Sequence, residues 1–156
     1  MSAYERFVTE ERLNAGGYRL VGTDLDDTGQ IEVSSRSGRL RAWGVRRPDR
    51  ALLWIDNAAH TWKNVFDGVP IPPASATLTI SGFRPRVEYS LEWWDPYAYE
   101  PAEQVTRTQP VVARPDGTIR LQIADLTSDI AVKIIATQAL WEGSLAEWPR
   151  HAPRIR

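Results

Sequence analysis

The sequence predicts an all-β protein: an antiparallel β-sandwich of about eight strands, jelly-roll or immunoglobulin-like, with a short N-terminal helix. Three observations lead to this prediction. Short segments that alternate apolar and polar residues follow one another from residue 31 to residue 137. Turn residues separate them at roughly 8 to 12 residue intervals, which is typical of sandwiches and barrels. Outside residues 58–75, no connection is long enough for a parallel crossover.

Residues 2–13 are predicted to form one amphipathic helix, which Gly16 and Gly17 end. Its apolar residues recur at helical spacing: Tyr4, Phe7, Val8 and Leu13. We therefore divide the chain into an N-terminal helix or linker (1–16), the sandwich (17–137) and a C-terminal tail or linker (138–156). The tail either links to a neighbour or packs Trp141 and Trp148 against the sandwich.

The predicted strands cover residues 31–36, 39–46, 51–57, 76–81, 87–94, 105–113, 118–123 and 130–137. Alternation assigns their faces, because neighbouring side chains of a strand point to opposite sides. Ile119, Leu121 and Ile123 are expected to point into the core. In the segment 87–94, Trp93 points inward and Trp94 outward. We expect two sheets with one wet face each.

Composition excludes several classes of function. A chain of 156 residues suits one domain and is too short for a barrel enzyme of about 250 residues. A net charge of −1 gives no global field toward nucleic acid or membrane, and no cysteine is present for a disulfide, a thiolate zinc site or a cysteine nucleophile. No apolar run approaches a membrane span, and the first residues do not read as a signal peptide. Because no catalytic motif occurs, we expect no enzyme activity; a glycosidase using Glu92 and Asp95 is the alternative.

Three segments follow one another in an order that resembles a known family. They are residues 51–57 followed by Thr61 and Trp62, residues 89–95 ending in Glu-Trp-Trp-Asp, and residues 128–134. They resemble the C-terminal β-sandwich domain of many secreted bacterial glycoside hydrolases with a (β/α)8 catalytic domain. The resemblance covers roughly residues 30 to 136. It implies an ancillary domain that packs on a catalytic barrel, binds carbohydrate, or does both. The aromatic loop that follows Asp95 departs from the family, which often has Thr-Gly there.

Two loops carry the candidate carbohydrate-binding residues. Sugar rings present an apolar face, which proteins bind with an exposed aromatic ring flanked by groups that hydrogen-bond hydroxyls. The platforms are expected to be Trp62 and Trp94, with the remaining contacts from Tyr97, Tyr99, His60, Asn57 and Asn64. The alternatives are that Trp62 folds back as a lid over the core and that Trp94 is buried beneath the N-terminal helix or the tail.

Trp43 and Trp54 lie inside strand patterns, and both are expected in the core. Asp24, Asp26 and Asp27 form an acidic turn that offers oxygen ligands for calcium. Otherwise no cofactor is expected, and a solvated turn is the alternative to a structural calcium ion.

The sequence thus predicts a non-catalytic carbohydrate-binding module of a polysaccharide-degrading enzyme. Its partners would be a polysaccharide or oligosaccharide and the catalytic domain of a glycoside hydrolase, with no nucleic acid and no membrane. The resemblance places it outside the cell as part of a larger enzyme. The alternative is a purely structural sandwich that packs on the catalytic barrel and binds no sugar of its own.

Overall fold

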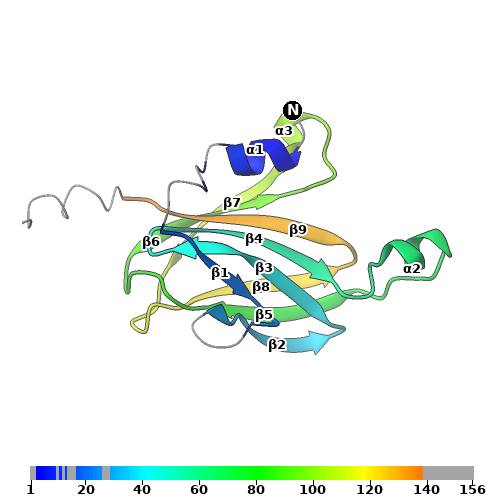
Figure 1. Ribbon diagram of the computed structural model, residues 1–156, viewed down its shortest axis with the longest axis horizontal. Coiled ribbons are helices and arrows are strands. Elements are labelled where there is room, and N and C mark those ends of the chain that lie inside the picture. The colour runs from blue at the N-terminus through cyan, green and yellow to red at the C-terminus, as the bar shows by residue number, and fades with distance from the viewer. Residues whose placement is uncertain (1–2, 10, 12, 14–16, 26–28, 139–156) are drawn as a thin grey trace, which may run out of the picture.

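The computed structural model describes residues 3–9, 11, 13, 17–25 and 29–138 (Figure 1). Within these residues the predicted fold is confirmed, with nine strands in two antiparallel sheets and a short N-terminal helix. The strands are β1 (Arg19–Gly22), β2 (Glu32–Ser37), β3 (Leu40–Arg47), β4 (Arg50–Asn57), β5 (Ala74–Ile80), β6 (Glu88–Trp94), β7 (Val105–Val112), β8 (Ile119–Leu126) and β9 (Asp129–Ala136). The helices are α1 (Ala3–Thr9), α2 (Trp62–Phe66) and α3 (Pro101–Gln104).

The larger sheet has six strands in the order β1-β3-β4-β9-β6-β7, and the smaller has three in the order β2-β5-β8. Each predicted strand is present, with ends that differ by at most three residues. The prediction missed β1, α2 and α3, which are only four or five residues long. The last strand, β9, lies between β4 and β6 in the middle of the larger sheet.

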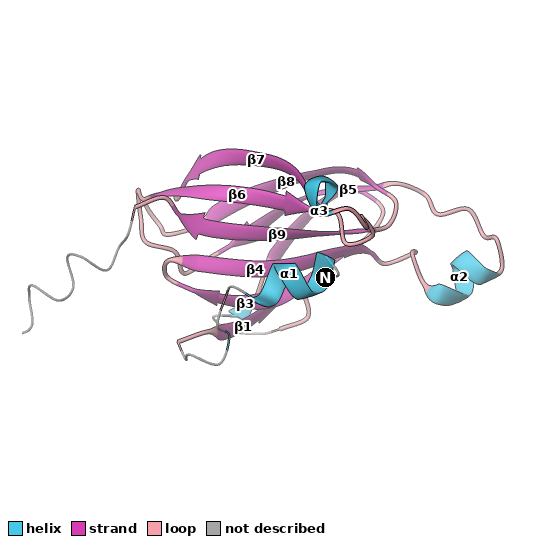
Figure 2. Ribbon diagram, turned by 90° about the horizontal axis from the view of Figure 1, so that it is seen from above, coloured by secondary structure: helices cyan, strands magenta, loops and turns pink. Residues whose placement is uncertain are grey.

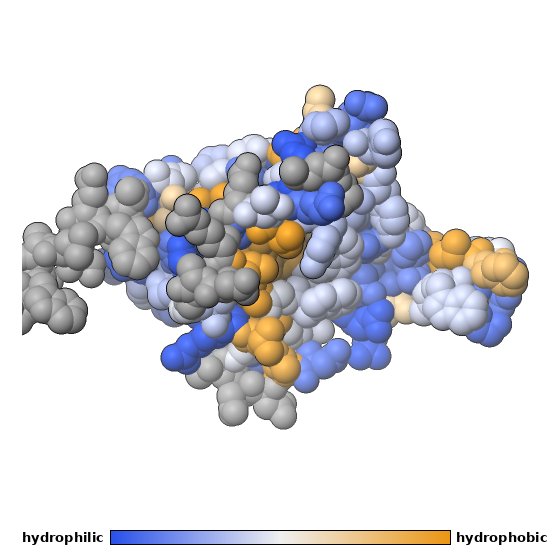
Figure 3. All heavy atoms as spheres, turned by 45° about the horizontal axis from the view of Figure 1, so that its top comes forward, coloured by the Kyte–Doolittle hydropathy of each residue, from blue (hydrophilic) through white to orange (hydrophobic). Residues whose placement is uncertain are grey.

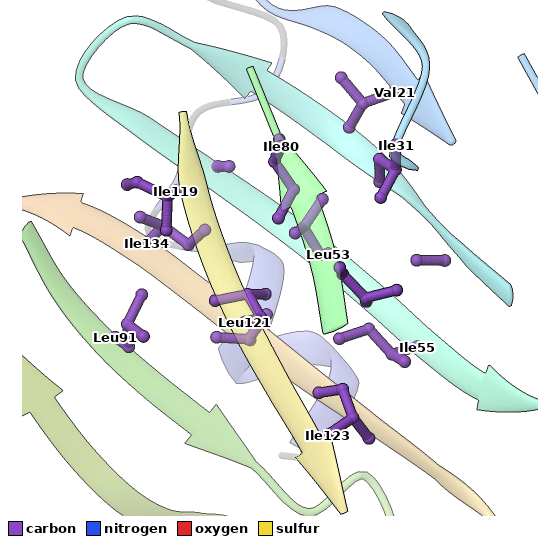
Figure 4. Packing of buried hydrophobic residues seen from close by; sticks show 14 of the residues in the cluster. Val21, Ile31, Leu53, Ile55, Ile80, Leu91, Ile119, Leu121, Ile123 and Ile134 are labelled. Carbon is purple, nitrogen blue, oxygen red and sulfur yellow. The ribbon is translucent and has the colours of Figure 1, made fainter. Parts of the chain in front are cut away.

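The main core fills the space between the two sheets, as alternation predicts. Figure 4 shows Ile119, Leu121 and Ile123 of β8 directed toward side chains of the larger sheet, among them Leu53 and Ile134. All five belong to one cluster of buried apolar residues. Burial of this surface is the main favourable contribution to folding.

A second, smaller core lies on the outer face of the six-stranded sheet, which we expected to be wet. Phe7 of α1 packs there against Leu52 of β4, Trp94 of β6 and Ala131 of β9. Figure 2 shows α1 lying across this face. Lys133 also points to this side, yet its side chain is buried, and it pairs with Glu11. Alternation gave the side of the sheet correctly but could not show that a helix covers it.

The predicted tail, including Trp141 and Trp148, lies outside the described residues. Within them, none of the helices has the length and apolar character that crossing a membrane requires.

Candidate functional site

The first aromatic loop carries α2 away from the sandwich (Figures 1 and 2). Thr61 caps this short helix, since its Oγ1 accepts a hydrogen bond from the backbone N–H of Asn64 at 3.1 Å. Lys63 and Asp67 pair one turn apart. Trp62 is 81% exposed and belongs to neither core cluster, so the alternative that it forms a lid over the core is wrong.

The exposed side chains of this projection are mostly apolar. They are Trp62, Val65, Phe66 and Val69, with Phe66 83% exposed. Figure 3 shows the apolar cap at the tip of the projection. Contiguous exposed apolar side chains of this kind are typical of an interaction surface.

Two asparagines expected to contact sugar hydroxyls are instead used inside the protein. Asn57 is buried, and its Nδ2 donates to the carbonyl oxygens of Pro72 and Leu126, both at 2.8 Å. Its Oδ1 accepts from the backbone N–H of Ala59 at 2.9 Å. The prediction for Asn57 as a sugar contact is therefore wrong, because the side chain ties three segments together. Asn64 donates through its Nδ2 to the Ala59 carbonyl at 2.8 Å and holds the same loop.

Trp94 is not an accessible platform, because α1 covers it. It is 5% exposed, and the ring of Phe7 meets it edge-on with centroids 5.7 Å apart. The alternative of burial beneath the N-terminal helix is the correct one. The aromatic surface of Trp94 packs within the second core.

Tyr97 and Tyr99 remain exposed, as predicted, at 63% and 90%. They line a hollow of about 500 Å³, together with Ala3, Glu5 and the other residues of the segment 96–101. The hydroxyl of Tyr97 donates to Oδ1 of Asp129. Burial of that hydroxyl, and then this hydrogen bond, raise the pKa of Tyr97 to about 12.

Asp129, at the start of β9, links the two predicted loops. His60 from the first loop places its Nδ1 4.0 Å from Asp129 Oδ1, the atom that accepts from Tyr97 of the second loop. His60 and Tyr97, two of the predicted sugar contacts, are thus brought together at Asp129. Trp62 and Tyr99 belong to these loops but take no part in the link. Sequence reasoning missed Asp129 because it lies at the start of a core strand.

The acidic turn is described only in part. Asp24 lies 3.7 Å from Arg39 Nη2, an exposed ion pair. Asp26 and Asp27 lie outside the described residues. Among the residues that the structure describes, no group of three or more potential ligands comes together to hold a metal ion.

Trp43 and Trp54 form a feature that the sequence analysis did not expect. They stand directly opposite each other on β3 and β4, and both point to the outer face of the six-stranded sheet. Trp43 is 47% exposed, so its assignment to the core is wrong. Trp54 is half-buried against the second core and not in the main one. The signal was present, since Trp43 shares its parity with Arg41 and Arg47, and charged residues mark the outward side of a strand.

A hollow of about 440 Å³ opens beside Trp43 over β1 and β3. Its lining residues are Leu20, Val21, Gly22, Thr23, Asp24, Leu25, Ala42, Trp43, Gly44 and Val45. Gly22 stands opposite Trp43 in the register of β1 and β3, and the side chain of Leu25 lies over this glycine. The indole of Trp43 and the side chain of Leu25 both line the hollow.

Charged groups border these indoles at one end of the strands. Arg41 binds Asp56 through two hydrogen bonds, one of them between Nε and Oδ1 at 3.1 Å. This bond is the main cause that raises the pKa of Arg41. Asp56 in turn stands opposite Asp129 in the register of β4 and β9. Two tryptophans, an ion pair and the Asp129 link thus share one face of the sheet.

Comparison of the chain with family models, with curated proteins and with solved structures found no match.

Proposed function

We propose that this chain is a non-catalytic carbohydrate-binding module that binds a glycan on the outer face of its six-stranded sheet. The observation that carries the proposal is the pair Trp43 and Trp54, which stand side by side on adjacent strands next to an open hollow. A rigid sheet holds both indoles in place before binding, so little side-chain ordering is needed. The proposal keeps the predicted function but moves the platform from Trp62 and Trp94 to other tryptophans.

Stacking and hydrogen bonding have separate sources on this face. The apolar C–H face of a pyranose packs on the exposed indole of Trp43. The Arg41–Asp56 pair lies two residues along the strands from the indoles, where its free N–H and oxygen positions suit hydroxyls of the next ring. Such open sites give modest affinity, because the flexible glycan must be ordered on binding.

The carboxylates on this face suit binding better than catalysis. Asp56 is held by Arg41, and Asp129 accepts from Tyr97. A general acid in a glycosidase must be free to donate its proton to the glycosidic oxygen, whereas both carboxylates are engaged by neighbouring side chains. We therefore propose no catalytic role. We also propose that the protein acts outside the cell, where polysaccharides are degraded.

Titration calorimetry against soluble glucan, mannan and xylan tests the proposal. Trp43→Ala is expected to weaken binding about thirtyfold, since loss of a tryptophan at the centre of a binding surface costs roughly 2 kcal/mol. Trp62→Ala is the matched control, because it removes an exposed indole of the same kind from the α2 projection, away from the proposed site. Equal loss in both variants, or no binding by the unaltered protein to any of a wide panel, would reject the outer face as the glycan site.

The α2 projection favours a second function, docking on a catalytic domain. Trp62 and Phe66 are the most exposed large apolar side chains of that loop, and the charged Lys63 beside them is paired with Asp67. They resemble the anchors of a protein interface more than a sugar platform. The resemblance to glycoside hydrolase ancillary domains suggests a (β/α)8 catalytic domain as the partner. Binding to such an isolated domain should be lost in the double variant Trp62→Ser and Phe66→Ser and kept in Trp43→Ala; retention in both variants would exclude α2 as the contact.

A further inference from the structure

The outer face carries a row of residues that runs beyond the exposed tryptophans. Trp43 of β3 pairs in register with Trp54 of β4, Trp54 with Ala131 of β9, and Ala131 with Trp94 of β6. All four side chains point to the same face, because directly paired residues in a sheet share a side. Three spacings of about 4.8 Å separate the first strand from the last, or roughly 14 Å. Two indoles at one end, a small alanine and a third indole form one continuous line.

Helix α1 covers only the far part of this row. Phe7 packs on Trp94 and Ala131, and the Arg6 guanidinium carbon lies 5.6 Å from the centroid of the Trp94 ring. Trp43 stays outside this cover and is partly exposed. The helix therefore divides the row into an open section and a closed one.

The indole N–H of Trp94 lacks a hydrogen bond beneath α1, within the part of the chain that the structure describes. Its Nε1–H is buried and finds no acceptor among the described residues. A buried donor without a partner costs free energy, whereas water or a sugar hydroxyl would satisfy it once α1 moves away. The closed arrangement thus contains a penalty that opening removes.

Polar contacts as well as the packing of Phe7 hold α1 on the sheet. The helix has seven residues, and helices this short are marginal on their own. Arg6 donates through Nη1 to the carbonyl of Pro101 at 2.8 Å and to Oε1 of Gln104 at 2.6 Å. Glu11, which follows the helix, pairs with Lys133 at 3.1 Å and with Arg50 at 2.7 Å. Terminal segments of proteins commonly open locally at lower free energy than the whole domain unfolds.

We infer that α1 is a displaceable strap over the closed section of this row, formed by Ala131 and Trp94, and that this section is part of the glycan surface. Displacement of α1 exposes Trp94, which extends the accessible surface formed by Trp43 and Trp54. The full row then binds an extended oligosaccharide in place of a single sugar ring. The identity of the ligand rests on the proposed function, whereas the movement of the strap does not. The protein gains affinity for long chains when the strap opens, because apparent affinity scales with the open fraction.

Thiol labelling tests the movement without any glycan. The chain has no cysteine, so a single Ala131→Cys provides a unique probe beneath α1. Ala42→Cys is the matched control: it is equally buried and lies in the same sheet, but it faces the main core. A labelling rate at position 131 at least about tenfold above that at position 42 supports local opening. Equal rates would show that α1 leaves only when the sandwich unfolds, and would overturn the inference.

Hydrogen exchange of the unaltered protein gives the same comparison if a cysteine variant fails to fold. Backbone amides of α1 are expected to exchange well before those of β4, which lies inside the sheet. Exchange of both at one rate would likewise overturn the inference.

Affinity measurements with oligosaccharides then test whether the opened surface binds glycan. Phe7→Ala removes the main apolar contact of α1 and is expected to raise affinity for long oligosaccharides several-fold, while Tyr4→Ala on the exposed side of the same helix should not. Adding Trp94→Ala to Phe7→Ala should cancel the gain. If Phe7→Ala shows no gain while binding still depends on Trp43, the closed section is not part of the glycan surface, and the proposed function still stands. Absence of binding in every variant would reject the proposed function, and labelling would still decide the movement.

Discussion

Asn57 shows how a single polar side chain can be buried without penalty. It lies at the end of β4, where the chain leaves the sheet toward α2, and its amide makes three hydrogen bonds to backbone groups of the 58–73 loop and of β8. These bonds connect the end of β4 to Ala59, Pro72 and Leu126. The side chain therefore fixes where the α2 projection begins and is unavailable to a ligand.

Replacement of this amide should destabilise the protein more than replacement of its neighbour. Asn57→Ala removes three hydrogen bonds made by a fully buried side chain, and we expect a loss of about 2 to 4 kcal/mol in the free energy of unfolding. Asn64→Ala removes one side-chain bond, to Ala59, from a less buried position and should cost about 1 kcal/mol. Urea unfolding followed by tryptophan fluorescence measures both. Similar losses would contradict the role assigned to Asn57.

The hydrogen bond between Tyr97 and Asp129 should make stability depend on alkaline pH. The pKa of Tyr97 is raised from 10.0 to about 12 in the folded protein. The unfolded chain therefore releases this proton at lower pH than the folded one, so stability from this group is complete below pH 10 and falls as pH rises to 12. Tyr97→Phe should show a smaller loss of stability across this interval, measured by urea unfolding at a series of pH values. A variant with the same slope as the unaltered protein would show that Tyr97 is not the group responsible.

At the scale of elements, α2 is a projection that the fold does not need. Phe66 is exposed on α2, whereas Phe83 is buried in the main core, where its ring meets Tyr89 with centroids 5.2 Å apart. We expect Phe66→Ala to change the free energy of unfolding by less than about 0.5 kcal/mol. Phe83→Ala should cost about 3 to 5 kcal/mol. A large loss from Phe66→Ala would mean that its side chain supports the sandwich, which would weaken the case for an interface on α2.

Local patterns predicted the strands well and the short elements poorly. Alternation found β8 because Ile119, Leu121 and Ile123 repeat cleanly, and burial of one face rewards that pattern strongly. A four-residue strand such as β1 has too few positions for any period to emerge. The helix α2 is set by the cap at Thr61, which resembles an ordinary loop residue in sequence.

The candidate site was less predictable than the fold, because it depends on what covers each face. Trp93 and Trp94 were assigned to the correct sides, yet alternation carries no information on a helix that packs from outside. Trp43 was misassigned because a place inside a strand does not tell which face of the sheet a tryptophan occupies. The parity that it shares with Arg41 and Arg47 is the better guide to its outward direction. The contact between His60 and Asp129 joins residues far apart in the chain, which local patterns do not detect.

At the scale of the molecule, the order of strands makes β9 the centre of the larger sheet. It joins the β1-β3-β4 group to the β6-β7 pair, although it is the last strand in the chain. Neither group can complete the sheet until β9 is in place. Long-range pairing of this kind makes folding slow and cooperative, because loop-closure entropy is lost before the contacts form.

A proline in β9 should therefore have a far larger effect than one in the edge strand β7. Val132 is fully buried and pairs with β4 on one side and β6 on the other, so Val132→Pro removes a ladder hydrogen bond from the middle of the sheet. We expect a loss above about 3 kcal/mol and little folded protein. Val112→Pro is the matched control, since β7 already contains Pro110 and residue 112 has the same parity, with its N–H directed away from β6. Circular dichroism during urea unfolding compares the two variants. Because β9 alone joins the two parts of the sheet, equal stability would mean that these parts hold together through the smaller sheet and not through their shared central strand.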